Sequence, residues 1–460
     1  MDRITRLLGA AILLAPTLAI AAAVTLPPPQ PYVKLQHPAW TRSASLYQIN
    51  TRQFSKAGTF AAVQAQLPRL KALGVDILWL MPIHPIGEEK RKGSLGSPYA
   101  VKDYYAVNPE FGTLDDLKAL VDAAHAQGMY VILDWVANHT AWDNPIREQH
   151  PEWYDRDYKG DYRPTPWWDW SDIIDLDYRQ AGVREYMADA MSYWVREVGI
   201  DGYRCDVAGF VPLDFWKQVR ARLDAIKPVF MLAEWESRDL HAEAFDATYA
   251  WSWHEAVHDV IQGHAGLDAL FVYYSWRESA YPADAYRMTY IANHDSNAWE
   301  GTQFEKFGDG LEAAIVLSVV GDGMPLIYNG QEAGNPRRLA FFEKDPITWR
   351  EHPIGDLYET LFDLKERNTT LHNGAHGATM LRVWNTAPEA VFSFVRQNAE
   401  DKVFVAINFS DEPQSVTFSD APFEGRYLEI FTGEDEVIDA DFRMTLPPWG
   451  YRVYTGIADR

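Results

Sequence analysis

Acidic side chains stand at the ends of several short apolar segments of the chain. Asp206 and Glu234 lie at the ends of two such segments, and Asp295 follows a third. An acidic residue after a strand is often only a helix N-cap, which explains any one of them taken alone. Together they indicate a site, because similar segment ends also carry a cation and two imidazoles. These are Arg204, His139 and His294.

Hydrolysis of a glycosidic bond is the reaction that requires such a group of carboxylates. One carboxylate attacks or supports the anomeric carbon, and another must carry a proton for the leaving oxygen. Crowded carboxylates repel, so one of them keeps its proton near neutral pH. Arg204 precedes Asp206 by two residues on the same strand face, so we expect it to keep Asp206 ionised and oriented. Glu236, two residues after Glu234, is its nearby rival for the acid role.

These side chains need a scaffold that points several strands in one direction. Between residues 45 and 332 short apolar segments alternate with amphipathic stretches, which predicts a βα succession and a parallel sheet. Residues 60–73 and 114–127 have helical spacing and end before Gly74 and Gly128. Eight such units predict a (β/α)8 TIM barrel, with an open doubly wound sheet as the alternative. The predicted strands are residues 45–50, 76–82, 129–136, 202–207, 229–234, 247–251, 287–293 and 325–329.

Two regions depart from this rhythm. Residues 139–178 are rich in Trp, Asp and Pro and poor in helical pattern, and a loop of this length inside a domain is usually functional. After about residue 371 strands follow one another without helices, which predicts an antiparallel β domain over residues 372–460. We therefore expect a catalytic barrel over residues 24–371, interrupted by an inserted domain at residues 139–178.

Residues 1–23 have the pattern of a secretory signal peptide. Arg3 and Arg6 precede an apolar stretch that ends in small residues with an A-x-A-like cleavage site. The stretch is short for a membrane-spanning helix, and an uncleaved anchor is the alternative. We expect a periplasmic or secreted protein with no membrane association after cleavage. The net charge of −23 argues against nucleic acid as a partner, because phosphates would repel it; the oligomeric state is not indicated.

Four blocks of sequence occur in a fixed order at the ends of the predicted strands. They read Asp134-x-x-x-Asn138-His139, Gly202-x-Arg204-x-Asp206, Glu234 and Asn293-His294-Asp295. In this order they resemble the α-amylase family, glycoside hydrolase family 13. Each motif alone would be weak, but the four together are specific, and the resemblance covers nearly all of the chain after residue 23. Shorter matches are Ser97-Pro98-Tyr99 before Asp103 and the segment PLIYNGQE at residues 325–332.

The resemblance implies a retaining enzyme with a domain inserted after the third barrel strand and a C-terminal β-sandwich domain. It implies that Asp206 is the nucleophile that forms a glycosyl-enzyme and that Glu234 is the acid/base. Asp295 matches the third carboxylate, which binds the sugar hydroxyls. Retention predicts a separation of about 5–5.5 Å between the two reacting carboxyl groups. The substrate-binding residues that the resemblance implies are Tyr99, His139, Arg204 and His294.

Calcium is implied for some members of that family. In those members Asn138 and Asp175 match ligands that tie the inserted domain to the barrel, and oxygen ligands of this kind suit Ca²⁺. A further family ligand is a main-chain oxygen, commonly of a His, at the position of Phe210, and this difference weakens the expectation. The alternative is that Asn138 only hydrogen-bonds loop backbone. No organic cofactor is expected.

The substrate implied by the resemblance is a starch-type α-1,4-glucan or a maltooligosaccharide, bound in an open cleft. Cleavage of cyclic dextrins, as by a cyclomaltodextrinase, or of α-1,6 bonds is the alternative, and Val207 after the nucleophile favours it slightly. Transglycosylation uses the same intermediate with a sugar as acceptor, so it stays open. From another class, the alternative is a non-catalytic carbohydrate-binding relative; such proteins typically lose one of the three carboxylates, and all three are present here.

Overall fold

The computed structural model describes residue 28 and residues 30–457. The predicted signal peptide at residues 1–23 lies outside the described residues. Residues up to Tyr32 belong to a separate unit, whose described residues contain no helix or strand. The second unit begins at Val33 and contains all the described helices and strands. Among the helices of residues 30–457, none is both long and apolar enough to span a membrane.

Eight parallel strands close into a barrel, in the spatial order β1-β10-β9-β8-β7-β6-β3-β2. Closure follows from the pairing of the first strand, because Leu46 lies opposite both Ile77 of β2 and Leu326 of β10. All eight predicted strands are confirmed, and the barrel replaces the open sheet that periodicity alone had left possible. The strands are β1 (Leu46–Ile49), β2 (Ile77–Leu80), β3 (Tyr130–Trp135), β6 (Gly202–Cys205), β7 (Phe230–Ala233), β8 (Ala247–Tyr249), β9 (Tyr286–Tyr290) and β10 (Met324–Tyr328).

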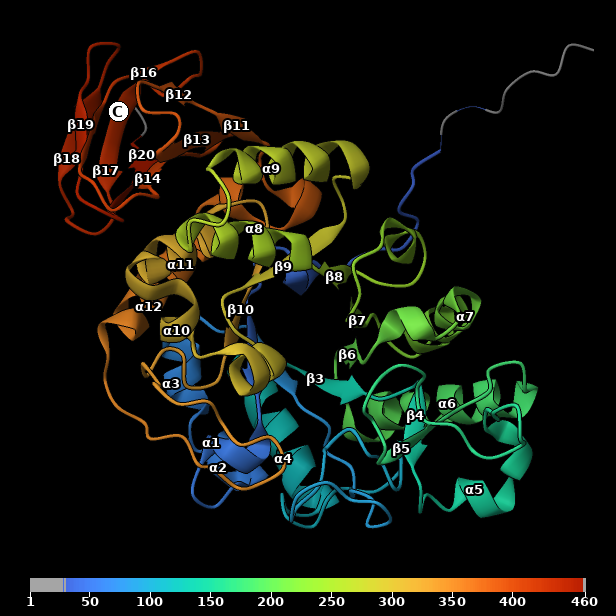
Figure 1. The fold of residues 1–460 in the computed structure, drawn as a ribbon. Helices are drawn as coiled ribbons and strands as arrows, with labels where there is room; N and C mark the ends of the chain where they lie inside the picture. Colours follow the sequence, from blue (N-terminus) through green and yellow to red (C-terminus); the bar gives the residue numbers. More distant parts are fainter. Residues whose placement is uncertain (1–27, 29, 458–460) are drawn as a thin grey trace, which may run out of the picture. The chain divides into compact units, whose positions relative to one another are not determined.

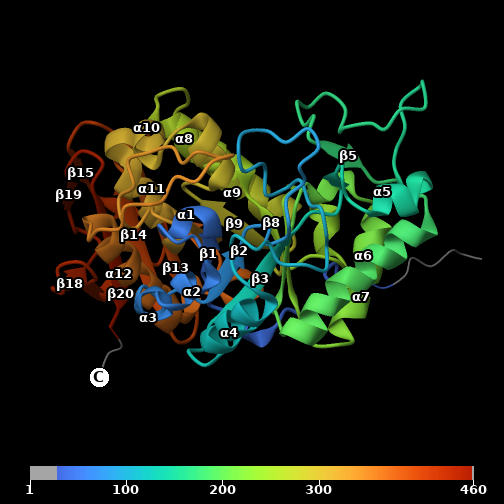
Figure 2. The same ribbon diagram turned by 90° about the horizontal axis from the view of Figure 1, so that it is seen from below.

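Helices lie around the outside of these strands (Figures 1 and 2). The expectation of one helix over residues 60–73 is wrong, because the chain forms α2 and α3, and Pro68 lies in the first turn of the second. Proline has no N–H to donate, so it fits a first turn better than a helix interior. Gly74 and Gly128 both have positive φ, as expected after helix ends. The longer helices are α2 (Phe60–Gln64), α3 (Leu67–Ala72), α4 (Leu114–His125), α6 (Ala181–Tyr193), α7 (Leu213–Asp224), α8 (Trp251–Ile261), α9 (Asp268–Ala280), α10 (Gln303–Phe307), α11 (Leu311–Val320) and α12 (Pro353–Arg367).

Successive residues on β6 face opposite sides of the barrel wall. Arg204 points inward, with its guanidinium 5.1 Å from the ring of Trp79 in the barrel interior. Cys205, the single cysteine of the chain, is buried in the layer between barrel and helices. The alternation of a strand therefore sends the functional group into the site and the thiol into the core.

The segment between β3 and α6 contains a two-stranded antiparallel sheet of β4 (His139–Ala141) and β5 (Ile173–Asp175). His139 lies directly opposite Asp175 in this pair. The short helix α5 (Ile146–Gln149) follows β4, and much of the remainder is irregular. This little sheet fixes the base of the inserted segment against the end of β3, so both predicted site residues that it carries are held by backbone pairing.

The C-terminal part is built from antiparallel strands, as predicted. Its main sheet has six strands, and two further strand pairs accompany it. Strand β18 was not expected, because three of its four residues face solvent or are partly exposed, and the segment carries two acidic residues. The main sheet consists of β11 (Met380–Arg382), β13 (Val391–Gln397), β14 (Lys402–Asn408), β20 (Tyr451–Gly456), β17 (Gly425–Glu429) and β18 (Asp435–Ile438). The pairs are β12 (Trp384–Asn385) with β16 (Phe418–Ser419), and β15 (Gln414–Val416) with β19 (Met444–Leu446).

Candidate active site

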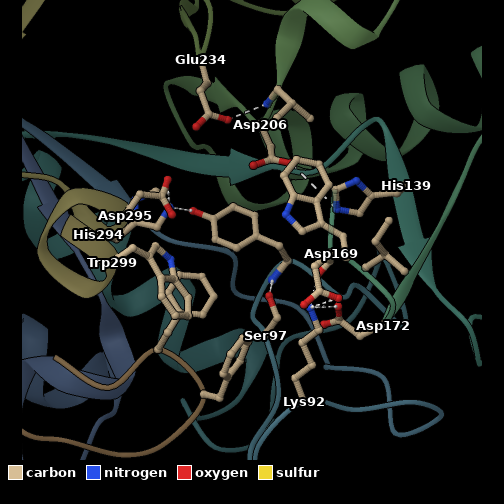
Figure 3. A pocket seen from close by; sticks show the side chains of 16 residues that line it. Lys92, Ser97, His139, Asp169, Asp172, Asp206, Glu234, His294, Asp295 and Trp299 are labelled. Carbon is tan, nitrogen blue, oxygen red and sulfur yellow. Dashed lines mark hydrogen bonds and ion pairs between the residues drawn. The ribbon is translucent and has the colours of Figure 1, made fainter. Parts of the chain in front are cut away.

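A cavity of about 420 Å³ lies at the carboxyl ends of the barrel strands (Figure 3). This is the face on which parallel barrels carry their functional residues, because all eight strands point toward it. Arg204 lies beneath the cavity and is fully buried. The structure thus brings together every residue predicted to react with or bind sugar. Those that line the cavity are Tyr99, His139, Asp206, Glu234, His294 and Asp295.

Arg204 is the centre of the charge arrangement. Its Nη1 lies 2.8 Å from Oδ1 of Asp134 and 3.0 Å from Oδ1 of Asp206. Its Nη2 lies 2.8 Å from Oε1 of Glu234. One buried cation therefore faces three carboxylates, and both predicted reacting groups are held by the same guanidinium. Its flat fork matches carboxylate geometry, which a lysine would not reproduce.

The electrostatics of this cluster differ from the expectation that Arg204 keeps Asp206 ionised. Burial raises the pKa of Asp206 well above its usual value; the charge of Glu234 adds to the rise, and Arg204 only partly opposes it. Burial likewise raises the pKa of Asp134 to about 6 against the attraction of Arg204. A single cation does not offset the burial of these aspartates, so without bound sugar Asp206 and Asp134 keep their protons to higher pH than free aspartates do.

Tyr99 and His294 form the floor of the cavity. The Tyr99 hydroxyl bonds to Asp134 at 3.0 Å and lies 2.7 Å from Nε2 of His294. Gln48 at the end of β1 holds the other ring nitrogen of His294 at 2.7 Å. The two rings stack with their centroids 5.3 Å apart, which leaves an aromatic surface facing the cavity. Such a surface suits the apolar face of a sugar ring.

The two predicted histidines are uncharged near neutral pH. Burial lowers the pKa of His139 to about 4, and burial together with the charge of Arg204 lowers that of His294 to about 3. A neutral imidazole offers one donor and one acceptor, which is what a sugar hydroxyl needs. Asp295 lies beside His294 at 3.2 Å, with 43% of its side chain open to the cavity. Desolvation by the surrounding protein raises the pKa of Asp295 to about 6, and the charge of Arg204 partly opposes this rise.

The turn after β6 places Glu234. Val207 has φ 35° and ψ 49°, a left-handed conformation that β-branched residues rarely adopt. In this conformation its N–H donates a hydrogen bond to Oε2 of Glu234 at 2.7 Å. A residue in this region costs about 1–3 kcal/mol and persists only where its surroundings impose it. The strained backbone of Val207 thus points its N–H group at Glu234, the predicted acid.

The rival carboxylate does not reach the cavity. Glu236 accepts a hydrogen bond from the Ser252 N–H at 3.0 Å and forms an ion pair with the buried Arg287. Its contacts lie with β9 and the start of α8, so its role is to join these elements. The geometry therefore distinguishes Glu234 from Glu236, which the sequence had separated only by their distance from the apolar segment.

Asn138 and Asp175 meet, but their arrangement does not fit a calcium ion. The Asn138 amide donates hydrogen bonds to Oδ1 of Asp175 at 3.1 Å and to Thr165 at 3.2 Å. The Thr165 hydroxyl donates to the same Asp175 oxygen at 2.6 Å. Calcium needs six to eight oxygen ligands, whereas here an N–H group and a hydroxyl both bond to the same Asp175 oxygen. The Asn138 amide joins the inserted segment to the barrel by bonds to side chains, in place of the bonds to loop backbone that the alternative expected.

Several cavity residues were not predicted, because they stand on loops without a periodic pattern. Trp299, Phe341 and Phe342 form one aromatic wall, with ring centroids 5.3 Å apart between the first two. Among the tryptophans of the Trp-rich insertion, Trp170 lines the cavity and Trp168 stacks on it at 5.0 Å. Tryptophan abundance was the only sequence signal for this wall. The remaining lining residues are Lys92, Ser97, Asp169, Asp172, Ile173 and Val207.

A parallel barrel whose rim presents carboxylates around one arginine, with neutral histidines and aromatic walls, has the site of a glycoside hydrolase. Residues 48–352 match the model of the alpha-amylase catalytic domain. Residues 381–453 match the model of the maltogenic amylase C-terminal domain. The chain belongs to the α-amylase family, glycoside hydrolase family 13, as the four sequence blocks indicated.

Relatives with different names share this architecture. This chain is similar to the crystal structure of the noncanonic maltogenic alpha-amylase AmyB from Thermotoga neapolitana, with 32% identity and a TM-score of 0.82. The match covers 91% of this chain and 99% of AmyB. Alpha-amylase MalA of Haloarcula japonica is 27% identical over 82% of this chain, which spans only 57% of MalA. A cyclomaltodextrinase from a Bacillus species is 25% identical over 81% of this chain and 74% of its own.

Proposed function

We propose that this protein is a retaining glycoside hydrolase that cleaves α-1,4 bonds of starch-type glucans and maltooligosaccharides. The observation that carries the proposal is the sharing of Arg204 by Asp206 and Glu234, at 3.0 and 2.8 Å. Two carboxylates held by one guanidinium flank the same cavity, as attack on one sugar with acid assistance requires. A retaining enzyme holds them about 5–5.5 Å apart, whereas an inverting one needs about 6.5–9.5 Å to admit a water molecule, and the stereochemistry of the products distinguishes the two.

The proposed reaction has two steps. Asp206 attacks the anomeric carbon while Glu234 gives its proton to the leaving oxygen, so the glycosidic bond breaks and a glycosyl-enzyme forms. Glu234 then takes a proton from water, whose oxygen attacks the same carbon and releases Asp206. Asp295 and the neutral His139 and His294 bind the hydroxyls of the reacting sugar, whose apolar face rests on Tyr99. Each group is already within the cavity.

Substitution of the acid tests this assignment. Glu234→Gln keeps the shape of the side chain but has no proton to give, so kcat on maltooligosaccharides falls by about 10²–10⁴-fold. On α-maltosyl fluoride, whose leaving group needs no proton, the bond-breaking step is spared. Glu236→Gln is the matched control, because this neighbouring glutamate contacts Ser252 and Arg287 rather than the cavity. Equal losses in both variants would remove Glu234 from the acid role.

Stereochemistry tests the retaining mechanism. NMR of the first products from maltotriose should show the α-anomer before mutarotation, and an initial β-anomer would refute a glycosyl-enzyme on Asp206. A panel of soluble starch, maltotriose, panose and cyclodextrins resolves the linkage, since the relatives include both alpha-amylases and a cyclomaltodextrinase. A wild type no more active than Glu234→Gln on the whole panel would leave only the non-catalytic alternative.

We also propose export from the cytoplasm, on the pattern of residues 1–23.

A further inference from the structure

A loop crosses one end of the cavity. We call residues 87–96 the cross-strap. It leaves the barrel through a β-bridge between Ile86 and Val101, and Gly87 donates a hydrogen bond to Ala100 at 2.9 Å. On its return Arg52, which is buried, donates to the carbonyl of Gly96 at 3.0 Å. Both feet of the cross-strap are therefore fixed to the barrel rim.

One side of the cross-strap is tied to the inserted segment. Lys92 lies 3.7 Å from the carboxylate of Asp172 and also donates to the backbone carbonyl of Asp169. Glu89 pairs with Arg147 at 3.0 Å. Lys92, Asp169 and Asp172 all line the cavity, and the Asp169 side chain is exposed, so the loop meets the inserted segment at the mouth of the site.

The other side of the cross-strap is tied to the loop that carries the aromatic wall. The Ser94 N–H donates to Glu343 at 2.7 Å, and its hydroxyl bonds to the same carboxylate. Leu95 N–H donates to the Phe342 carbonyl at 3.2 Å. Gly93 has a positive φ of 63°, and a Cβ there would lie 2.5 Å from that of Phe342. Only glycine permits this close approach, so the two loops are packed against each other.

The cross-strap therefore links both walls of the cavity and occupies the end remote from Glu234. In Figure 3 Glu234 and Lys92 lie at opposite ends, with Asp206 and Asp295 between them. Glu234 protonates the oxygen of the leaving chain, so the leaving chain lies on its side of the reacting sugar. The remaining sugars of the donor, toward its non-reducing end, must extend in the other direction and meet the cross-strap.

On the leaving-chain side, the described residues next to the acid include an aromatic pair. Phe210, four residues after the nucleophile, is 40% exposed, and its ring lies 5.3 Å from that of Trp235. Trp235 follows Glu234 directly and packs over Gly209, where a Cβ would lie 2.1 Å from the indole. A partly exposed aromatic pair beside the acid is a platform on which further sugars of a long chain can stack. The described residues thus place a loop tied to both walls on one side of the cleaved bond and an aromatic pair on the other.

We propose that the cross-strap makes this enzyme act from the non-reducing ends of α-glucan chains, releasing glucose or maltose, in place of the open cleft that the resemblance implied. This inference rests on the proposed function, because it takes its direction from Glu234 as the acid. The donor side holds only a short piece of the chain, and the body of the substrate lies over Phe210 and Trp235.

Blocked substrates test the proposal. The purified full chain is assayed on p-nitrophenyl maltoheptaoside and on the same compound with its non-reducing end capped by a 4,6-ethylidene group. We expect the capped compound to be cleaved at least about tenfold more slowly, a difference of about 1.4 kcal/mol. Cyclodextrins, which have no chain end, should be poor substrates as well. The first product from maltoheptaose should be glucose or maltose throughout the time course.

Two variants connect this behaviour to the cross-strap. One replaces residues 89–95 by Gly-Gly, and the other, Lys92→Ala with Ser94→Ala, cuts one tie on each side without shortening the loop. Both should gain activity on the capped substrate relative to the free one. Lys159→Ala is the control, because it removes an exposed lysine of the insertion that does not line the cavity. Melting curves and activity on the free substrate verify folding. If the variant with the shortened loop does not fold, the result of the double variant decides.

Each result has one meaning. Equal rates of the wild type on free and capped substrates overturn the inference and leave the proposed hydrolase standing. Variants that are folded and active on the free substrate, yet gain nothing on the capped one, remove the cross-strap as the cause and overturn it too. A wild type inactive on every α-glucan refutes the proposed function, and the inference falls with it.

Discussion

Replacement of Asp134 by Asn should shift the acid limb of the pH–rate profile to lower pH. Asp134 does not line the cavity, but it competes with Asp206 for Arg204. Its removal acts on Asp206 twice in the same direction. It takes away one neighbouring negative charge, and it leaves more of the guanidinium to the nucleophile. Both changes lower the pKa of Asp206, which must be ionised to attack.

The magnitude follows from the distances around Arg204. Nη1 is 2.8 Å from Asp134 and 3.0 Å from Asp206, so these two carboxylate oxygens lie no more than about 6 Å apart. Two unit charges at about 6 Å interact by about 2.8 kcal/mol at an effective dielectric constant of about 20. That corresponds to about two pKa units. Solvent in the open cavity screens part of this interaction, so we expect a shift of about one to two pH units.

The assay is kcat/KM on a p-nitrophenyl maltooligosaccharide from pH 4 to 9, because this profile reports the free enzyme. The plateau also falls in Asp134→Asn, since Tyr99 and Trp79 lose part of their anchor. The position of the limb is independent of that height. Asp246→Asn is the matched control, a buried aspartate held by Arg220 at 2.7 Å that does not line the cavity. An acid limb that stays in place or moves to higher pH in Asp134→Asn would refute the account of the shared cation.

Two further predictions concern stability. Burial lowers the pKa of Lys365 from 10.5 to about 7. Above pH 7 the unfolded chain therefore binds more protons than the native state, and this residue makes the free energy of unfolding rise by about 2 kcal/mol between pH 7 and 9. Denaturant titrations should show a smaller rise of the free energy of unfolding with pH in Lys365→Met than in the wild type. An identical pH slope in the two proteins would contradict the lowered pKa of Lys365. Chelation and readdition of Ca²⁺ should change the melting temperature by less than about 1 °C, because Asn138 and Asp175 bond to each other. A calcium site filled at a hundredfold excess over its Kd would instead lower the stability by about 2.7 kcal/mol when the ion is removed, and a melting shift of that size would contradict the prediction.

The barrel was predictable because its strands are buried on both faces. In β3 Val131, Ile132 and Leu133 are all fully buried, and such continuous apolar runs are the strongest signal of a parallel strand. Prediction failed where a local exception interrupted the pattern. Pro68 divides a stretch of helical periodicity into two helices, and the acidic, exposed strand β18 has no apolar run to mark it. The proline acts locally through its missing N–H, whereas β18 depends on its pairing with β17, and periodicity contains neither effect.

The site was predictable residue by residue but not as a charge arrangement. Strand ends and motif order brought the three carboxylates to one rim, and the cavity contains them all. The pairing of Asp134 with Arg204 depends on β3 and β6 being neighbours in register, although almost 70 residues separate them in sequence. That contact decides how much of the cation reaches Asp206. Sequence spacing related Arg204 to Asp206 alone: Arg204 does lower the pKa of the nucleophile, but burial and the charge of Glu234, which spacing does not reveal, outweigh it.

The same reasoning explains why the barrel fixes the reaction while the loops fix the substrate. Arg204 and the residues around it stand on strands whose register is set by backbone pairing, so the charge cluster is rigid. The residues that meet the donor chain, Lys92 and Phe342, stand on loops that are joined by a few side-chain and backbone hydrogen bonds. Changing one of those bonds costs little stability but opens one side of the cavity. A family with one reaction and several substrates requires this separation, and here the cross-strap is the part free to vary.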